Sequence, residues 1–181
     1  MDRNILLTRP ARLPAKIALV LAGTALLALA AKVQVPFWPV PMTLQTLAVL
    51  MIGATLGARM AGATLLAYLA EGAVGLPVFA SGAGLAYMAG PTGGYLLGFL
   101  LAAVFVGLAA DRGWLRGGVP AAAVMFAAMA LIYLPGVAWL AALIGAEKAV
   151  AGGLVPFLPA EAFKLALAVL LARPLARRGR G

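Results

Sequence analysis

The feature that most constrains this fold is a series of long apolar runs that carry very little charge. The chain is 65% hydrophobic and 10% charged, whereas a typical soluble domain is about 25% charged. The runs are continuous rather than alternating, which predicts membrane-spanning α-helices and excludes a β-barrel. Because each span needs about 20 residues, the length of the chain allows roughly six helices in one membrane domain covering 1–181.

The apolar runs and the breaks between them predict an all-α integral membrane bundle of six spans. A tight turn near Ala58 to Gly62 separates the second span from the third. Pro135 ends or kinks the fifth span, and 136–146 is expected as a short helical turn at the membrane interface. Pro159 suits the first turn of the last helix. The six spans are expected near residues 15–31, 43–58, 60–76, 95–110, 118–134 and 160–175.

Two connecting segments are too unusual in composition to be simple turns. Segment 33–43 contains Pro36, Pro39 and Pro41, which forbid a regular helix and favour extended backbone before each proline. Segment 77–94 is uncharged and rich in glycine, and loops of that length are commonly functional. Irregular backbone is not tolerated against lipid, so both segments are expected at the membrane surface or over a protein-lined cavity.

The net charge of +9 lies mainly at the two ends of the chain, which favours cytoplasmic flanks over nucleic-acid binding. Six spans put both termini on one side of the membrane, and we assign that side to the cytoplasm. Both unusual segments and the head of the last helix then face outwards, where they predict a pocket capped by two loops. This assignment places 11 of the 14 basic residues inside: Arg3, Arg9, Arg12, Lys16, Arg59, Arg112, Arg116, Arg173, Arg177, Arg178 and Arg180.

Missing residue types exclude several kinds of chemistry. The sequence contains no cysteine and no histidine, which removes disulfides, thiolate metal sites, thiol nucleophiles and imidazole acid–base catalysis. No phosphate-binding G-x-x-x-x-G-K-[ST] motif occurs. We therefore expect no catalytic residue, no metal and no cofactor in this chain, and an intramembrane enzyme is disfavoured.

Charged residues inside apolar runs are the strongest candidates for function. Glu161 and Lys164 lie three residues apart and face the same side of a helix. Charges at membrane depth are costly, so the pair predicts a ligand site, an ion path or a mutual ion pair. Glu71, near the middle of the third span, is interpreted as a structural carboxyl group, with a ligand contact or a pairing with Lys164 as alternatives. The alternative function is a stand-alone transporter of a small vitamin-like solute, either facilitative or proton-coupled through Glu71 and Glu161, although no internal repeat is evident.

Three stretches resemble the signature segments of the BioY family, and the resemblance extends from about Lys16 to Leu171. Members of that family are biotin-specific substrate-capture subunits, the S components of energy-coupling factor (ECF) transporters. The resemblance implies a six-helix S-component bundle in the cytoplasmic (inner) membrane with both termini inside. It also implies biotin as the transported ligand, with a membrane coupling subunit and two ATPase subunits as partners. The stretches are Val35-Pro-Phe-Trp-Pro-Val-Pro-Met-Thr-Leu-Gln-Thr46, Gly75-Leu-Pro-Val-Phe79 and Gly90-Pro-Thr-Gly-Gly-Tyr95.

The same resemblance implies which residues meet biotin. The family usually has an Asp-x-x-Lys motif at the start of the last helix, and here it reads Glu161-Ala-Phe-Lys164. Glu161 is expected to accept a ureido N–H, while Lys164 is expected to meet either the carboxylate or the ureido oxygen. Further candidates are Thr43 and Gln45 as hydrogen-bonding groups, Trp38, Tyr87 and Tyr95 as walls, and Gly93 for close backbone approach.

Docking to the coupling subunit is expected to use a pair of small residues on the first helix. S components resemble one another in an Ala-xxx-Ala motif there, and Ala18 and Ala22 have the matching spacing. Small residues four apart let helix backbones approach closely.

Overall fold

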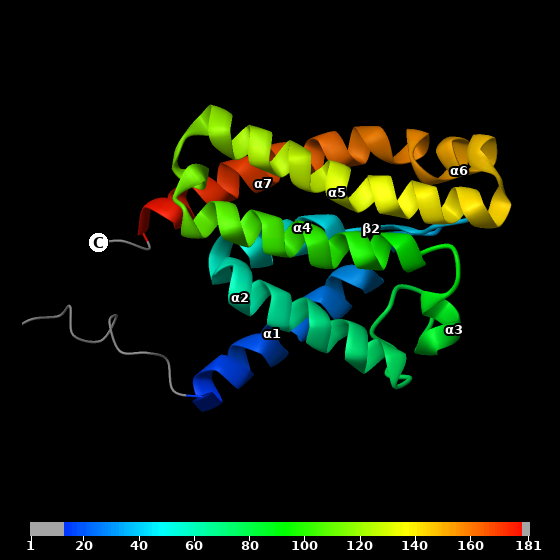
Figure 1. The fold of residues 1–181 in the computed structure, drawn as a ribbon, viewed down its shortest axis with the longest axis horizontal. Helices are drawn as coiled ribbons and strands as arrows, with labels where there is room; N and C mark the ends of the chain where they lie inside the picture. The colour runs from blue at the N-terminus through cyan, green and yellow to red at the C-terminus, as the bar shows by residue number, and fades with distance from the viewer. Residues whose placement is uncertain (1–12, 179–181) are drawn as a thin grey trace, which may run out of the picture.

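The computed structural model describes residues 13–178, apart from the side chains of Arg173 and 175–178. Four of the arginines used to assign the membrane orientation, Arg3, Arg9, Arg12 and Arg180, lie outside the described residues. The elements in chain order are α1 Leu13–Lys32, β1 Gln34–Val35, β2 Met42–Thr43, α2 Gln45–Ala73, α3 Gly84–Met88, α4 Gly93–Asp111, η2 Trp114–Arg116, α5 Gly118–Ile144, α6 Ala146–Gly153, η3 Val155–Phe157 and α7 Leu158–Arg178 (Figure 1).

Helix α2 is a hairpin of two antiparallel halves rather than one rod. Gly57 adopts φ 74° and ψ 170°, a conformation that is essentially restricted to glycine. The amide Nε2 of Gln45 donates a 2.8 Å hydrogen bond to the hydroxyl of Tyr68, although these residues would stand about 35 Å apart in a continuous helix. The predicted turn near Ala58 to Gly62 is therefore wrong in position, because a single glycine reverses the chain at residue 57.

Counting both halves of α2, the described chain makes six antiparallel passes, as the sequence predicted. Five of its helices are long and apolar enough to cross a membrane, with α2 counted once. One end of the bundle, the turn end, holds the start of α1, η2 and the end of α7 (Figure 1). Gly57 lies at this end too, beside Asp111 at the end of α4. The opposite end, the loop end, holds β1, β2, α3 and α6 (Figure 1).

Helix α5 continues through Pro135 to Ile144, so the predicted break at 134 and the separate interfacial turn at 136–146 are both wrong. Two glycines of α4 explain why α5 tolerates a proline in its interior. A Cβ added at Gly94 would collide with the carbonyl of Pro135, and one added at Gly98 would lie 2.7 Å from Cα of Ile132. Because α4 packs this closely against the proline, a helix that has lost one hydrogen bond is held by its neighbour.

The two unusual segments are more ordered than the sequence indicated. Strands β1 and β2 pair antiparallel, with Gln34 opposite Thr43 and Val35 opposite Met42. Segment 77–94 is not a loop throughout, because it contains α3 and the first turn of α4, which begins at Gly93 rather than 95. Helix α6, Ala146–Gly153, has no counterpart among the predicted elements.

Candidate ligand-binding site

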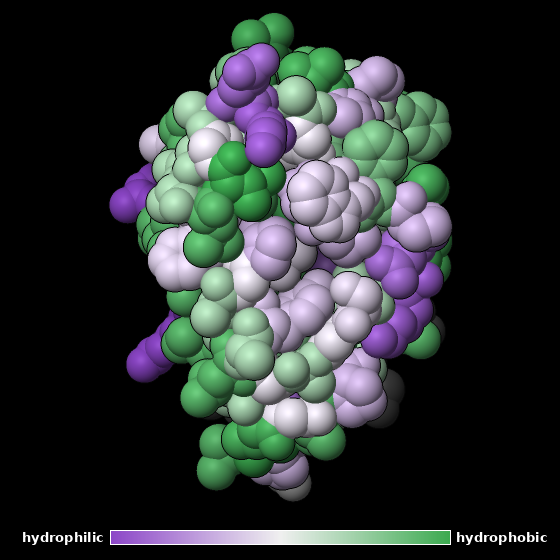
Figure 2. Space-filling view, turned by 90° about the vertical axis from the view of Figure 1, so that its right-hand side faces the viewer, coloured by the Kyte–Doolittle hydropathy of each residue, from purple (hydrophilic) through white to green (hydrophobic). Residues whose placement is uncertain are grey.

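A cavity reaches from the loop end towards the middle of the bundle. Figure 2 looks onto the loop end and shows a pale, weakly polar central area with hydrophobic groups around it and hydrophilic groups near the margins. The cavity contains about 500 Å³ of space between atoms, counting its open mouth. The lining residues are Val40, Pro41, Thr43, Gln45, Thr46, Phe79, Ala80, Tyr87, Thr92, Tyr95, Leu96, Phe99, Ile132, Tyr133, Phe157 and Glu161.

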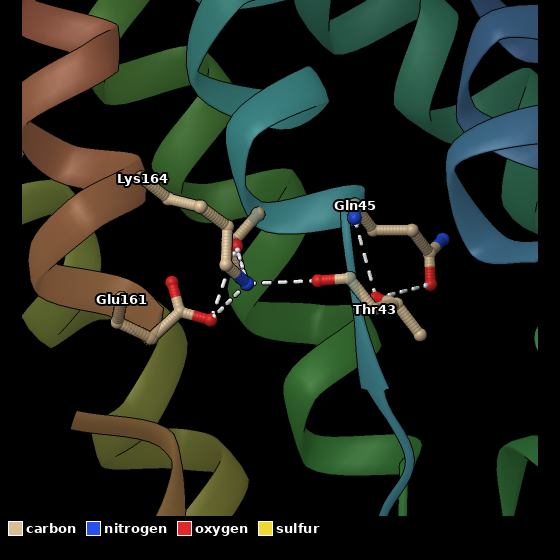
Figure 3. Close-up of polar contacts among 5 residues, drawn as sticks. Thr43, Gln45, Glu161 and Lys164 are labelled. Atoms are coloured by element: carbon tan, nitrogen blue, oxygen red, sulfur yellow. Dashed lines mark hydrogen bonds and ion pairs between the residues drawn. The ribbon is translucent and has the colours of Figure 1, made fainter. Parts of the chain in front are cut away.

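The polar side of the cavity is built on an ion pair between Glu161 and Lys164, one turn apart on α7. Nζ of Lys164 lies 2.5 Å from Oε1 of Glu161. The same ammonium donates to the carbonyl oxygen of Thr43 at 2.8 Å and to the hydroxyl of Thr46 at 2.9 Å. Figure 3 shows these bonds joining α7 to the junction of β2 and α2.

Thr46 completes this network from the first turn of α2. Its hydroxyl accepts from Lys164 and donates to Oε1 of Glu161 at 3.2 Å. Thr46, Glu161 and Lys164 are 5%, 7% and 6% exposed. Burying a carboxylate and an ammonium is tolerated because each is paired and hydrogen-bonded.

The second oxygen of Glu161, Oε2, is buried and accepts no hydrogen bond of normal geometry within residues 13–178, although the hydroxyl of Tyr133 lies close to this carboxylate. Buried polar atoms in native proteins are nearly always hydrogen-bonded, and leaving an acceptor unsatisfied is costly. Glu161 lines the cavity, so this oxygen is available to a donor that enters it.

Gln45 and Tyr68 form a second polar cluster beneath the loops. Besides accepting from Gln45, the Tyr68 hydroxyl donates to the carbonyl oxygen of Val78 at 3.0 Å. The Thr43 hydroxyl accepts from the backbone N–H of Gln45 at 3.2 Å and fixes the entry of α2 (Figure 3). The start of α2 and the segment after it are thus held together by side chains at the cavity.

Aromatic rings make up much of the rest of the wall. Tyr87 of α3 stacks on Phe79, with ring centroids 5.0 Å apart. Tyr95 of α4 meets Tyr133 of α5 edge to face at 5.7 Å and donates through its hydroxyl to the carbonyl of Gly153 at 2.8 Å. Apolar and aromatic walls with a few convergent polar groups are typical of small-molecule sites.

Comparison with known proteins places this arrangement in a family. The model of the BioY family matches residues 4–181. The chain belongs to the BioY family. A Thermotoga maritima protein named "Biotin transporter BioY" is 38% identical over 156 residues, which cover 82% of this chain and 88% of that protein. A Pyrococcus horikoshii protein named "Probable biotin transporter BioY" is 37% identical over 161 residues, covering 88% of this chain and 95% of the relative.

A solved structure shares the fold of this BioY-family chain. It is described as the S component for biotin from an ECF-type ABC transporter, and it aligns with a TM-score of 0.78 at 22% identity. The alignment covers 93% of this chain and 96% of the solved one. The predicted S-component bundle is confirmed, and the chain is a multi-pass membrane protein.

Five of the residues predicted to bind ligand line the cavity of this BioY-family chain: Thr43, Gln45, Tyr87, Tyr95 and Glu161. The structure does not bring three others into the lining. Lys164 lies behind Glu161, and Trp38 is 78% exposed. A Cβ at Gly93 would collide with the carbonyl of Met88, so close packing between α3 and α4 accounts for that glycine.

The remaining predicted positions lie away from the cavity. Glu71 is two residues from the end of α2 and half-buried, so the prediction of a mid-depth carboxyl group is wrong. The hydrogen bonds of Lys164 go to Thr43, Thr46 and Glu161, not to Glu71. Ala18 and Ala22 are exposed on α1.

The sequence did not single out several residues that line the cavity. Thr46 follows Gln45 in the same stretch, and a hydroxyl directly before the apolar run 47–54 is the signal that could have found it. Tyr133 is a ring with a polar tip within the apolar run of α5. Phe79 and Phe157 carry no comparable signal, because an apolar ring facing a cavity reads like any core residue.

Proposed function

We propose that this chain is the substrate-capture subunit of an ECF-type transporter and that it binds biotin for uptake across the cytoplasmic membrane. The observation that carries the proposal is the buried carboxylate of Glu161 at the wall of an aromatic-lined cavity, where its Oε2 accepts no hydrogen bond of normal geometry from residues 13–178. Family membership supports it, as do relatives named as biotin transporters and a fold shared with an S component for biotin.

The cavity suits the chemistry of biotin. The ligand carries a ureido ring with two N–H donors, an apolar thioether ring and a carboxylate tail. Glu161 supplies an acceptor for a ureido N–H, while Thr43 and Gln45 add polar groups at the start of α2. Tyr87 and Tyr95 line the cavity and offer aromatic walls for the apolar ring.

The orientation that fits this function has the loop end outside the cell and both termini in the cytoplasm. Arg59, Arg112 and Arg116 are exposed at the turn end, in agreement with the preference of basic residues for the cytoplasmic side. Ala18 and Ala22 are exposed on α1 and offer a flat face to the coupling subunit. Energy for release comes from two ATPase subunits bound to that coupling subunit.

Calorimetry on the purified full-length protein tests biotin binding. Wild-type protein should bind biotin, and Glu161→Ala should lose about tenfold or more in affinity, with Glu147→Ala on exposed α6 as the matched control. No binding by the wild type, or unchanged binding by Glu161→Ala, would contradict the proposal. Uptake of labelled biotin should require ATPase subunits competent for hydrolysis.

A further inference from the structure

Two open apolar grooves run along α4, and they share no lining residue with the candidate ligand cavity. The first groove lies between α4, η2 and α5, and the second between α4, the second half of α2 and α5. Counting their open mouths, they contain about 520 and 860 Å³ of space between atoms. No charged side chain lines either of them. The first is lined by Phe105, Trp114, Pro120, Ala123 and Val124, and the lining of the second includes Gly62, Leu66, Leu101, Leu108 and Leu131.

Phe105 lines both grooves, so they lie on either side of one half-buried ring. Two apolar channels separated by a single ring suit the two acyl chains of one lipid. At spacings of four, three and four residues, one face of α4 carries Leu101, Phe105, Leu108 and Arg112. From Leu101 to Arg112 this face measures about 16 Å, and one leaflet of a bilayer holds about 15 Å of hydrocarbon. The grooves therefore match the depth of one leaflet, with Arg112 on its headgroup side.

Arg112 touches the end of both grooves. Its guanidinium carbon lies 5.8 Å from the ring centroid of Trp114, which lines the first groove. Its Nη1 donates to the carbonyl oxygen of Leu108, which lines the second, at 3.4 Å. Arg116 stands close by, because a Cβ added at Gly113 would lie 3.7 Å from its Nε. Two guanidinium groups thus meet at the mouth that the grooves share.

Arg59 reaches the second groove from α2. It precedes Gly62 by three residues and therefore lies on the face of α2 that lines this groove. Its neighbour Ala58 donates its backbone N–H to Asp111, the neighbour of Arg112, at 3.1 Å. This bond brings Arg59 and Arg112 to the same end of the second groove, at the turn end of the bundle (Figure 1).

The mouth carries an excess of positive charge. Arg59, Arg112 and Arg116 are all exposed, and within residues 13–178 none of them forms an ion pair with a carboxylate. The nearby Asp111 is a single negative charge, and one of its oxygens is already bonded to a backbone N–H. Guanidinium groups bind phosphate through paired hydrogen bonds. Trp114 is half-exposed, as is usual for tryptophan at the level of lipid headgroups.

We infer that this face binds one anionic diacyl phospholipid, with its chains in the two grooves and its phosphate at the arginines. The positive mouth favours an anionic headgroup over a zwitterionic one. The length of the grooves favours a lipid over a partner helix. Their lining residues on α4 begin at Leu100, whereas a helix that crosses the membrane needs contact through both leaflets. Biotin binding does not depend on this site.

Native mass spectrometry of the purified full-length protein measures lipid affinity, with dioleoyl phosphatidylglycerol as the anionic probe and dioleoyl phosphatidylcholine as the zwitterionic one. The wild type should bind phosphatidylglycerol about tenfold more tightly. Arg59→Gln combined with Arg112→Gln should lower the phosphatidylglycerol affinity about 20-fold and leave that for phosphatidylcholine within about twofold. Lys16→Gln is the matched control, because Lys16 is exposed at the turn end on α1, and it should change neither affinity.

Ala123→Phe tests the grooves separately from the charges. Ala123 is exposed and lines the first groove, so a ring at this position occupies the space of one acyl chain. It should weaken both lipids by about threefold or more through lost packing contacts. Glycerophosphoglycerol, the same headgroup without chains, should not displace phosphatidylglycerol. Thermal unfolding in detergent verifies that each variant is folded.

Equal wild-type affinities for the two lipids would overturn the inference, as would equal losses in Lys16→Gln and in the double arginine variant. Displacement by the deacylated headgroup would show a site for soluble phosphate instead of a lipid site. Dimers that replace the lipid adducts and dissociate in Ala123→Phe would show that a second copy of the chain covers the grooves. None of these outcomes would alter biotin binding, so the proposed function is tested independently.

Discussion

The ammonium of Lys32 donates a 2.6 Å hydrogen bond to the carbonyl oxygen of Phe79, 47 residues further along the chain. Lys32 ends α1, and Phe79 is a cavity wall residue that stacks on Tyr87. The neighbouring carbonyls are held in the same way, Val78 by Tyr68 and Ala80 by Gln34. Three side chains thus fix three successive carbonyls behind one wall of the cavity.

Lys32→Met should raise the rate of biotin dissociation by up to about tenfold, because one hydrogen bond from a charged donor no longer holds the Phe79 wall. Displacement kinetics with labelled biotin measure this rate. Lys148→Met is the control, since Lys148 is also an exposed lysine at the loop end and makes no hydrogen bond among the described residues. An unchanged rate in Lys32→Met would mean that the wall does not depend on this bond.

Tyr68→Phe should lower the free energy of unfolding by about 1–3 kcal/mol. The Tyr68 side chain is fully buried, and its hydroxyl serves both Gln45 and the carbonyl of Val78. Thermal unfolding in detergent without ligand measures the loss. Tyr87→Phe is the matched control, because the Tyr87 hydroxyl makes no hydrogen bond within residues 13–178 and its ring keeps the stack on Phe79. Equal stabilities of the two variants would contradict the assignment.

Asp111→Ala should cost about 1 kcal/mol of stability. A carboxylate oxygen of Asp111, at the end of α4, accepts from the backbone N–H of Ala58 at 3.1 Å and so caps the second half of α2. Asp111→Asn keeps an acceptor and should lose less. A larger loss for Asn than for Ala in the same unfolding assay would argue against capping.

Gly57→Ala should lower the free energy of unfolding by about 1–3 kcal/mol, which is more than the loss expected for Asp111→Ala. Its backbone φ of +74° is unfavourable for alanine, and the added Cβ would collide with the Asp111 carboxylate. The double change Gly57→Ala with Asp111→Ala separates these causes, because it removes the collision and keeps the strained backbone. If the double variant is as stable as Asp111→Ala alone, the collision alone is responsible for the loss of stability in Gly57→Ala.

The proposed orientation predicts which face of the membrane each loop occupies. The chain has no native cysteine, so single cysteines report without background. Ser81→Cys, exposed at the loop end, should react with a membrane-impermeant maleimide on intact cells, whereas Arg116→Cys, exposed at the turn end, should react only after permeabilisation. The reverse pattern would place the termini outside.

Hydropathy and charge position were enough to predict the membrane class, the six passes and the pairing of Glu161 with Lys164 as one possibility. These are properties of short stretches: an apolar run of sufficient length must span, and two charges one helical turn apart must share a face. The five predicted residues that line the cavity lie next to helix ends or connections, where polar and aromatic groups stand out from the apolar background.

Only the tertiary structure decided what each charge touches. Thr46 reaches Glu161 across 115 residues of sequence, and no local pattern encodes that contact. Pro135 lies inside α5 where Gly94 of another helix packs against its carbonyl, and Trp38 is largely exposed although Val40 and Pro41 of the same segment line the cavity. Side-chain partners, unlike membrane spans, depend on how helices distant in sequence pack, since one hydrogen bond requires both atoms to be within about 3 Å.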